Sequence, residues 1–289
     1  MAIPRRTFIQ QAGLLSAGLF INPSDFLLKA PEAGLQLWTL REELKKDVKG
    51  VMAKVAAAGY ADVETFGGGN QFFGLAPKIF KQLLNDHQLI SSSGHYYFPV
   101  NYQVAKEFDD VILSFMEAAN IMQQTYIVIP SLPEALYNTA DGCKMAAEKL
   151  NRAGELCRSA NLQLAYHNHD FEFKQFGTQT GYDILLKETD ASLVKMELDL
   201  YFAIKAGKDP LALFAKAPGR FALWHIKDMD KSDPALNTEV GSGSINFKKI
   251  FAHAQEAGVR RYFIEQENFS MNPFRSIKKS CDFFKKTFR

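Results

Sequence analysis

Residues 163–170 read QLAYHNHD, a short and largely apolar run that ends in a cluster of polar side chains. A run of this length and composition is typical of a buried β-strand. Amphipathic stretches with helical spacing lie on either side of it, at 141–160 and at 181–188. The segment therefore predicts a strand between two helices, with His167, Asn168, His169 and Asp170 gathered where the strand ends.

The same alternation recurs along the chain after residue 31. Short β-type runs lie at 35–40, 62–65, 89–93, 126–129, 163–167, 194–199, 221–225 and 262–265. Helical patterns follow them at 48–58, 76–85, 104–119, 141–160, 181–188, 210–217, 247–257 and 273–286, and Gly59 and Gly258 stand where helices commonly end. Eight strands that are each followed by a helix predict an α/β protein with a closed (β/α)8 TIM barrel, in one domain over 32–289.

Composition and charge narrow the classes of function. The 289 residues carry a net charge of only +2, with no continuous basic stripe, which argues against a nucleic-acid partner. The three cysteines form no CxxC pair, so the chain predicts neither a disulfide framework nor a cysteine metal site. No apolar run is long enough to anchor the protein stably in a membrane.

The first 31 residues are expected to lie outside the barrel. Arg5 and Arg6 precede Phe8, and a weakly apolar stretch follows at 12–21. This pattern is typical of a twin-arginine export signal, which predicts a signal and linker over 1–31 and a periplasmic protein. The alternative is a basic, slightly amphipathic first helix.

Histidines and carboxylates collect at the predicted strand ends. Side chains two residues apart on a strand share a face, as in the pairs His167 and His169, Glu197 and Asp199, His225 and Lys227, and Glu265 and Glu267. Four strands would thus aim such groups into the mouth of one barrel. Buried charges at this density are costly unless they are paired or bind a metal.

One ligand from each of the last four predicted strands gives the best metal set, which is His167, Asp199, His225 and Glu265. Imidazole and carboxylate donors together suit Mn²⁺, Zn²⁺, Co²⁺ or Fe²⁺ better than Ca²⁺. The alternative is a polar plug held by hydrogen bonds without a metal.

Six segments carry a resemblance to a known family. They are 59–64 (GYADVE), 166–173 (YHNHDFEF), 197–201 (ELDLY), 225–229 (HIKDM), 239–247 (EVGSGSINF) and 265–267 (EQE). In this order and spacing they resemble the xylose isomerase-like barrel superfamily, the sugar phosphate isomerase/epimerase group, from about residue 34 onward. The resemblance implies a divalent metal held by Asp199, His225 and Glu265. His167 stands where many epimerases have glutamate, and its His-x-His setting is similar to that of inosose dehydratases.

The resemblance also implies a reaction, in which a base removes a proton next to a carbonyl while a metal stabilises the enediolate. His169 is the first choice for acid or base, and Glu265 is the second. Lys227 would neutralise an oxyanion or bind a substrate hydroxyl, unless it only pairs with a nearby carboxylate.

Substrate contacts are expected from Glu64, His95 and Trp38. The aromatic rings of Trp38, Phe66, Tyr96 and Phe202 would wall the pocket, with packing in the core as the alternative for each.

The predicted function is a metal-dependent isomerase or epimerase acting on a small sugar or keto-sugar. Two alternatives stay open. One is a lyase or dehydratase that eliminates water or an alcohol, with His95 or His169 as the acid for the leaving group. The other is a sugar-binding barrel without catalysis. Export would favour a free or oxidised sugar, or a glycoside, over a sugar phosphate, and homo-oligomer formation is left open.

Overall fold

The computed structural model describes residues 32–67 and 69–288, and the export signal predicted at 1–31 lies outside them. Eight parallel strands close into a barrel in the order β1-β12-β9-β8-β5-β4-β3-β2, within one compact unit that spans Glu32–Arg289. The strands are β1 (Ala33–Gln36), β2 (Asp62–Phe66), β3 (Ile90–His95), β4 (Tyr126–Ile129), β5 (Gln163–His167), β8 (Val194–Asp199), β9 (Leu223–Ile226) and β12 (Arg261–Ile264). The predicted closed (β/α)8 barrel is confirmed.

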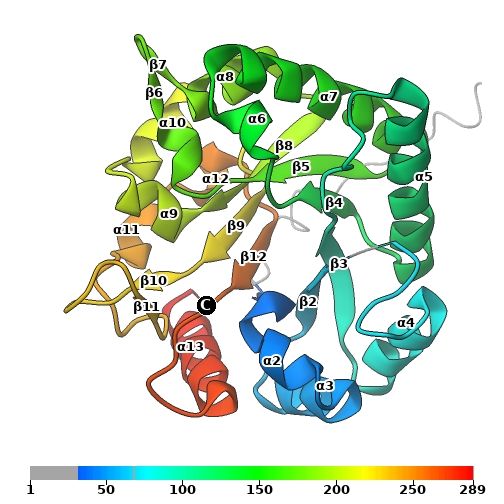
Figure 1. Cartoon of the computed structure of the whole chain (residues 1–289). Coiled ribbons are helices and arrows are strands. Elements are labelled where there is room, and N and C mark those ends of the chain that lie inside the picture. The colour runs from blue at the N-terminus through cyan, green and yellow to red at the C-terminus, as the bar shows by residue number, and fades with distance from the viewer. Residues whose placement is uncertain (1–31, 68, 289) are drawn as a thin grey trace, which may run out of the picture. The chain divides into compact units, whose positions relative to one another are not determined.

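Helices surround the barrel and connect its strands (Figure 1). The longer ones are α3 (Val48–Ala57), α4 (Pro77–Asp86), α5 (Ala105–Met122), α7 (Ala140–Ser159), α8 (Gly181–Glu188), α10 (Pro210–Lys216) and α13 (Pro273–Thr287). Shorter ones are η2 (Leu37–Leu40), α2 (Arg41–Leu44), α6 (Glu134–Tyr137), η3 (Phe171–Phe173), α9 (Leu200–Lys205), α11 (Phe247–Phe251) and α12 (Ala254–Ala257). Two small hairpins pair β6 (Gln175–Phe176) with β7 (Gln179–Thr180) and β10 (Asp228–Met229) with β11 (Asn237–Thr238).

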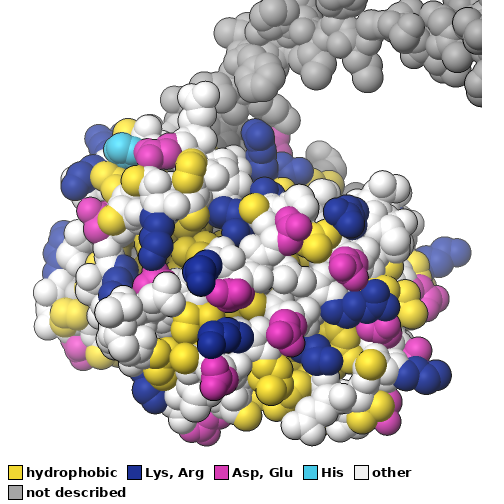
Figure 2. All heavy atoms as spheres, turned by 90° about the horizontal axis from the view of Figure 1, so that it is seen from above, with side chains coloured by type: hydrophobic (Ala, Val, Ile, Leu, Met, Phe, Trp, Pro, Cys, Tyr) yellow, Lys and Arg dark blue, Asp and Glu magenta, His cyan; other side chains and the backbone are white. Residues whose placement is uncertain are grey.

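The described helices include none that is both long and apolar enough to cross a membrane. On the face shown in Figure 2, basic and acidic side chains are interspersed and no continuous basic area forms. This mixture agrees with the small net charge of +2.

Two predicted elements differ from the structure by more than a small shift of their ends. The strand predicted at 35–40 ends at Gln36, because the side chain of Gln36 accepts the backbone N–H of Trp38 at 2.9 Å and turns the chain into η2. The helix predicted at 247–257 breaks into α11 and α12, because the N–H of His253 bonds to the carbonyl of Ile250, three residues back, and tightens the turn. The first difference matters for function, since it brings Trp38 to the mouth of the barrel.

The expected helix-ending glycines are confirmed by their backbone angles. Gly258 follows α12 with a φ of +81°, and Gly59 follows α3 with a φ of +99°. Both angles lie in the left-handed region that favours glycine. At Gly258 a side chain would also collide with the neighbouring backbone, because its Cβ would lie 2.6 Å from the Cα of Gly219.

A small buried apolar cluster, distinct from the main hydrophobic core, comes from the barrel strands and the residue before β9. It consists of Tyr126, Val128, Ala165, Ala222, Leu223 and Phe263. Three of these residues lie two positions before a histidine or a carboxylate at the mouth of the barrel. Each of the three therefore shares a face of its strand with that polar residue. The polar groups at the mouth therefore rest on an apolar layer.

Asp228 holds the loop that leads into α11. Its buried carboxylate accepts the backbone N–H groups of Gly241 at 2.8 Å, Gly243 at 3.0 Å and Ile245 at 3.1 Å. We expect Asp228→Ala to lower the free energy of unfolding by about 3 kcal/mol, because three donors lose a charged acceptor. Urea denaturation measures this loss. Asp228→Asn keeps one acceptor oxygen and should cost less, so equal costs for the two variants would contradict this account.

Candidate active site

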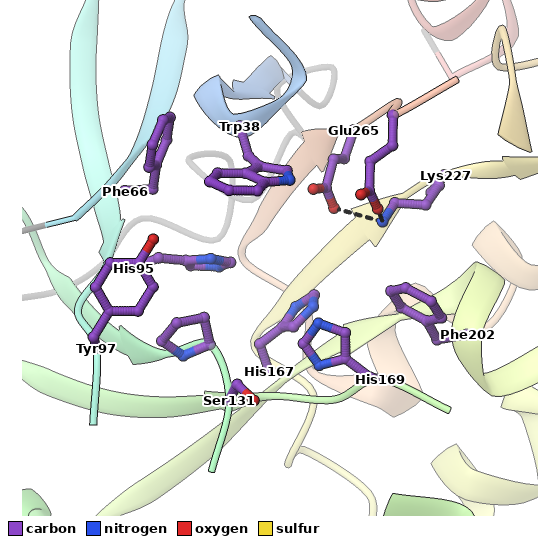
Figure 3. A pocket seen from close by; sticks show the side chains of 12 residues that line it. Trp38, Phe66, His95, Tyr97, Ser131, His167, His169, Phe202, Lys227 and Glu265 are labelled. Atoms are coloured by element: carbon purple, nitrogen blue, oxygen red, sulfur yellow. Dashed lines mark hydrogen bonds and ion pairs between the residues drawn. The ribbon is translucent and has the colours of Figure 1, made fainter. Parts of the chain in front are cut away.

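A cavity of about 280 Å³ lies at the C-terminal ends of the barrel strands (Figure 3). Residues at or just after the ends of seven of the eight strands form its wall together with Phe202 of α9. The lining residues are Trp38, Phe66, His95, Tyr97, Pro130, Ser131, His167, His169, Phe202, Lys227, Glu265 and Glu267. Most of the residues that the sequence singled out therefore meet in one pocket.

Three histidines surround the buried carboxylate of Glu197. The Oε2 atom of Glu197 lies 2.7 Å from Nε2 of His95, 3.2 Å from Nε2 of His225 and 3.3 Å from Nδ1 of His167. The ligand atoms of these four residues all lie within 4.8 Å of one another, and all four residues are buried. The other oxygen of Glu197 has no hydrogen-bond partner among the described residues.

Glu64 lies behind these histidines and does not line the cavity. It accepts hydrogen bonds from Gln36 at 2.7 Å and from Ser93 at 2.6 Å, and it lies 2.6 Å from Nε2 of His225. Burial alone would raise the pKa of Glu64, but the charges and hydrogen bonds of His95 and His225 lower it. In the structure Glu64 therefore contacts His225 and His95, whereas the sequence suggested that it contacts substrate.

The charges around His95 and His225 also set their protonation. Burial lowers the pKa of a histidine, but the charges of Glu64 and Glu197 outweigh it and raise the pKa of His95 to about 9. For His225, Glu197 together with its other carboxylate neighbours raises the pKa well above its ordinary value. The pKa of His167 is lowered, first by burial and then by the charge of His225. The neighbouring carboxylates thus favour the charged forms of His95 and His225, whereas burial favours the neutral form of His167.

A second group brings together Asp199, His225 and Glu265, whose ligand atoms also lie within 4.8 Å of one another. Lys227 joins it, with its Nζ 3.0 Å from Glu265 and 3.4 Å from Asp199. The same Nζ lies 2.8 Å from Glu267. Burial by itself would lower the pKa of Lys227. The three carboxylates outweigh burial and raise this pKa above its ordinary value, so the ammonium stays charged.

Asp199 is the least stabilised carboxylate of this second group. Burial raises its pKa to about 6, although Lys227 opposes the shift. Its Oδ1 accepts the N–H of Phe202 at 2.8 Å, whereas its buried Oδ2 has no hydrogen-bond partner among the described residues. A buried carboxylate oxygen that has no hydrogen bond and only a 3.4 Å ion pair with Lys227, beside one imidazole and a second carboxylate, fits a divalent cation of the Mn²⁺, Zn²⁺ or Co²⁺ type.

The four predicted metal ligands do not form one group. Asp199, His225 and Glu265 lie together, whereas His167 belongs to the group around Glu197. His225 is common to both groups. The buried Nδ1 of His167 has no hydrogen-bond partner within the described chain, although Glu197 is 3.3 Å away.

His169 lines the cavity, as expected for an acid or base. Its ring stacks on Phe171 at 5.1 Å, contacts Phe202 at 5.0 Å, and leaves Nδ1 without a hydrogen-bond partner in the described structure. Burial, and then the charge of Lys227, lowers its pKa to about 4. The ring is therefore an uncharged proton acceptor near neutral pH.

Tyr96 was predicted to line the cavity, but its neighbour Tyr97 does so instead. Tyr96 is buried away from the cavity, where its hydroxyl donates to Gln124 at 2.5 Å, and Tyr97 lines the cavity in its place. Sequence reasoning gave no role to Glu197 and Glu267, although each shares a strand face with a predicted ligand two residues away. That spacing is the signal that identifies them.

Comparisons with known proteins identify the family of the barrel. The family model of the xylose isomerase-like TIM barrel matches residues 52–287. Inosose dehydratases of Clostridium beijerinckii and Geobacillus thermodenitrificans are each 26% identical over 170 residues, which cover 52% of this chain and 56% of each relative. The chain thus spans just over half the length of the curated relatives it matches.

Solved structures extend the likeness over nearly the whole barrel. A sugar phosphate isomerase/epimerase from Parabacteroides distasonis has a TM-score of 0.79 at 29% identity, and the match covers 90% of this chain and 95% of that one. A D-allulose 3-epimerase from Methylomonas sp. shares the fold with a TM-score of 0.68 at 12% identity, over 90% of this chain and 98% of that one. Because the family model matches most of the sequence, the chain belongs to the xylose isomerase-like TIM-barrel family.

Proposed function

We propose that the protein is a metal-dependent sugar isomerase or epimerase that removes a proton from the carbon next to a carbonyl. The observation that carries this proposal is the buried group of Asp199, His225 and Glu265, whose member Glu265 lines the cavity beside Lys227. These three residues would hold the metal. A divalent cation there would supply Lewis-acid stabilisation of the negative charge that develops on the carbonyl oxygen.

The protein's own groups account for proton movement. His169 and Glu265 lie on facing sides of the cavity in Figure 3, so a sugar between them meets a proton acceptor on either side. Lys227 places an ammonium 3.0 Å from Glu265, where it would hold a substrate hydroxyl or oxyanion. The aromatic ring of Phe202 lies 4.5 Å from this ammonium and closes that side of the cavity.

A lyase or dehydratase is the second candidate, and two observations favour it. The curated relatives are inosose dehydratases, and the end of β5 carries His167 in place of the glutamate typical of epimerases. Elimination begins with the same proton removal and then needs an acid for the leaving group. His95 lines the same cavity and would serve as that acid.

Exchange of the proton next to the carbonyl tests the shared step. We expect the protein with Mn²⁺ to incorporate deuterium from deuterated water into at least one member of a panel of aldoses, ketoses and keto-sugars. Nuclear magnetic resonance locates the exchanged position, and mass spectrometry identifies the product. An unchanged product mass apart from deuterium supports the isomerase or epimerase, whereas loss of water or an alcohol supports the lyase. Absence of exchange and of product throughout the panel would refute both.

Glu64 is predicted to orient His225 for the metal. Its carboxylate is 2.6 Å from Nε2, so the opposite nitrogen, Nδ1, is left to face Asp199 and Glu265. We expect Glu64→Gln to weaken Mn²⁺ binding by about 10–100-fold, the usual effect of losing a partner behind a metal-binding histidine. Isothermal titration calorimetry measures the affinity. Glu172→Gln also removes a buried carboxylate near the mouth, but one that contacts Tyr166 rather than His225, and should leave the affinity nearly unchanged. Equal affinities for wild type and Glu64→Gln would contradict the role.

A further inference from the structure

A second cavity of about 440 Å³ adjoins the candidate active site. The rings of Trp38 and Phe66 border both cavities. They meet edge to face with their centres 5.0 Å apart, and Phe73 continues the row at 5.0 Å from Phe66. One line of aromatic rings therefore runs from the catalytic pocket into the second cavity.

The outer side of the second cavity is polar and comes mainly from α2. Arg41 lies over the Trp38 ring at 4.9 Å and donates from Nη1 to the carbonyl of Trp38 at 3.0 Å. Lys45 pairs with Glu42 at 2.8 Å on the same rim. Aromatic faces on one side and fixed donors and acceptors on the other form the surroundings that suit a sugar ring, which has apolar faces and a hydroxyl edge.

We propose that the second cavity binds the second sugar unit of a disaccharide or glycoside whose first unit occupies the catalytic pocket. The proposal rests on the proposed function and names its substrate class. The catalytic cavity of about 280 Å³ is at the small end for ligand pockets, and the second cavity more than doubles the space along the same aromatic row.

The rim favours a neutral sugar unit over a phosphate group. Its cations already have partners: Lys45 pairs with Glu42 at 2.8 Å, Lys46 pairs with Glu43 at 3.1 Å, and Arg41 is held by the ring and the carbonyl of Trp38. A phosphate would need cations that are free to converge on it. The hydroxyl groups of a sugar instead exchange hydrogen bonds with paired acids and bases without separating them.

Calorimetric titration of the full-length protein with Mn²⁺ tests the proposal. The probes are glucose and galactose, and the disaccharides cellobiose, maltose, lactose and melibiose. We expect at least one disaccharide to bind about tenfold more tightly than either of its component sugars, the gain of one stacked ring with its hydrogen bonds. The proposal is overturned if no disaccharide binds more tightly than its components.

Two variants test whether the gain in affinity for the disaccharide comes from the second cavity. Phe73→Ala removes a wall of the second cavity, and Lys45→Trp fills the cavity from the exposed rim without removing a core contact. We expect both to abolish the disaccharide advantage, whereas Lys49→Trp, an exposed position on α3 that does not line the cavity, should retain it. An advantage that survives both variants would place the second unit elsewhere and overturn the proposal. Binding is measured without turnover, so this failure is distinct from a failure of proton exchange on monosaccharides.

Discussion

Glu265→Gln is expected to lower kcat/KM in the proton-exchange assay by at least about a thousandfold, within the range for loss of an acid–base group. The substitution keeps the size of the side chain but removes the charge that lies 2.9 Å from Nδ1 of His225 and 3.0 Å from Lys227. The neutral amide is both a weaker metal ligand and unable to transfer a proton. Deuterium incorporation, measured at saturating Mn²⁺ on a variant shown to be folded by circular dichroism, gives the loss.

Glu267→Gln is the matched control. It removes a carboxylate from the same lysine, at 2.8 Å, but Glu267 belongs to neither group of candidate metal ligands and its side chain is 32% exposed. We expect its effect to stay below about tenfold. Glu265→Gln activity within tenfold of wild type would remove Glu265 from the chemistry.

Lys227→Met is expected to destabilise the metal-free protein by about 3–5 kcal/mol, the usual cost of breaking a buried ion pair. Lys227 is only 1% exposed and neutralises Asp199, Glu265 and Glu267, which would repel one another in its absence. A bound divalent cation would neutralise two of the same carboxylates, Asp199 and Glu265. Adding Mn²⁺ at about 100 times its Kd should therefore stabilise the variant by about 3 kcal/mol. Urea denaturation with and without Mn²⁺ measures both effects.

Lys205→Met provides the comparison, because Lys205 also pairs with a carboxylate, Asp170 at 3.0 Å, but at the protein surface. Exposed pairs contribute less than about 1 kcal/mol, and Mn²⁺ should not alter this cost. If Lys227→Met costs no more than Lys205→Met, the ammonium does not hold the carboxylates together. If Mn²⁺ stabilises Lys227→Met no better than chloride salts of monovalent cations, the carboxylates do not bind the metal.

The barrel and most of its mouth could be predicted from local patterns. Strand ends and side-chain alternation are encoded within a few residues, which is why the sequence alone gathers Asp199, His225 and Glu265, together with His167, at one mouth of the barrel. These local patterns do not reveal how deep within the barrel a side chain lies. Glu197 precedes Asp199 by two residues, about 6.6 Å along the strand, and it meets His95 at 2.7 Å although their strands, β8 and β3, are not adjacent in the barrel.

Two errors lie at the ends of strands. Beyond the end of β3 at His95 the strand pattern was not extended to Tyr96 and Tyr97, although Tyr97, two residues after His95, lines the cavity with it while Tyr96 packs in the core. In β1 the Gln36 side chain ends the strand by accepting the N–H of Trp38, a local hydrogen bond that hydrophobic pattern does not reveal. Both places border the cavity, where the chain leaves regular structure.

The metal content of the purified full-length protein tests the central claim most directly. Plasma mass spectrometry of the wild type should find about one divalent ion of Mn, Zn or Co per chain. His225→Ala should lose it, because His225 belongs to both groups of candidate ligands. Absence of bound metal from the wild type, even after reconstitution with each of these ions, would contradict the proposed metal-assisted removal of a proton.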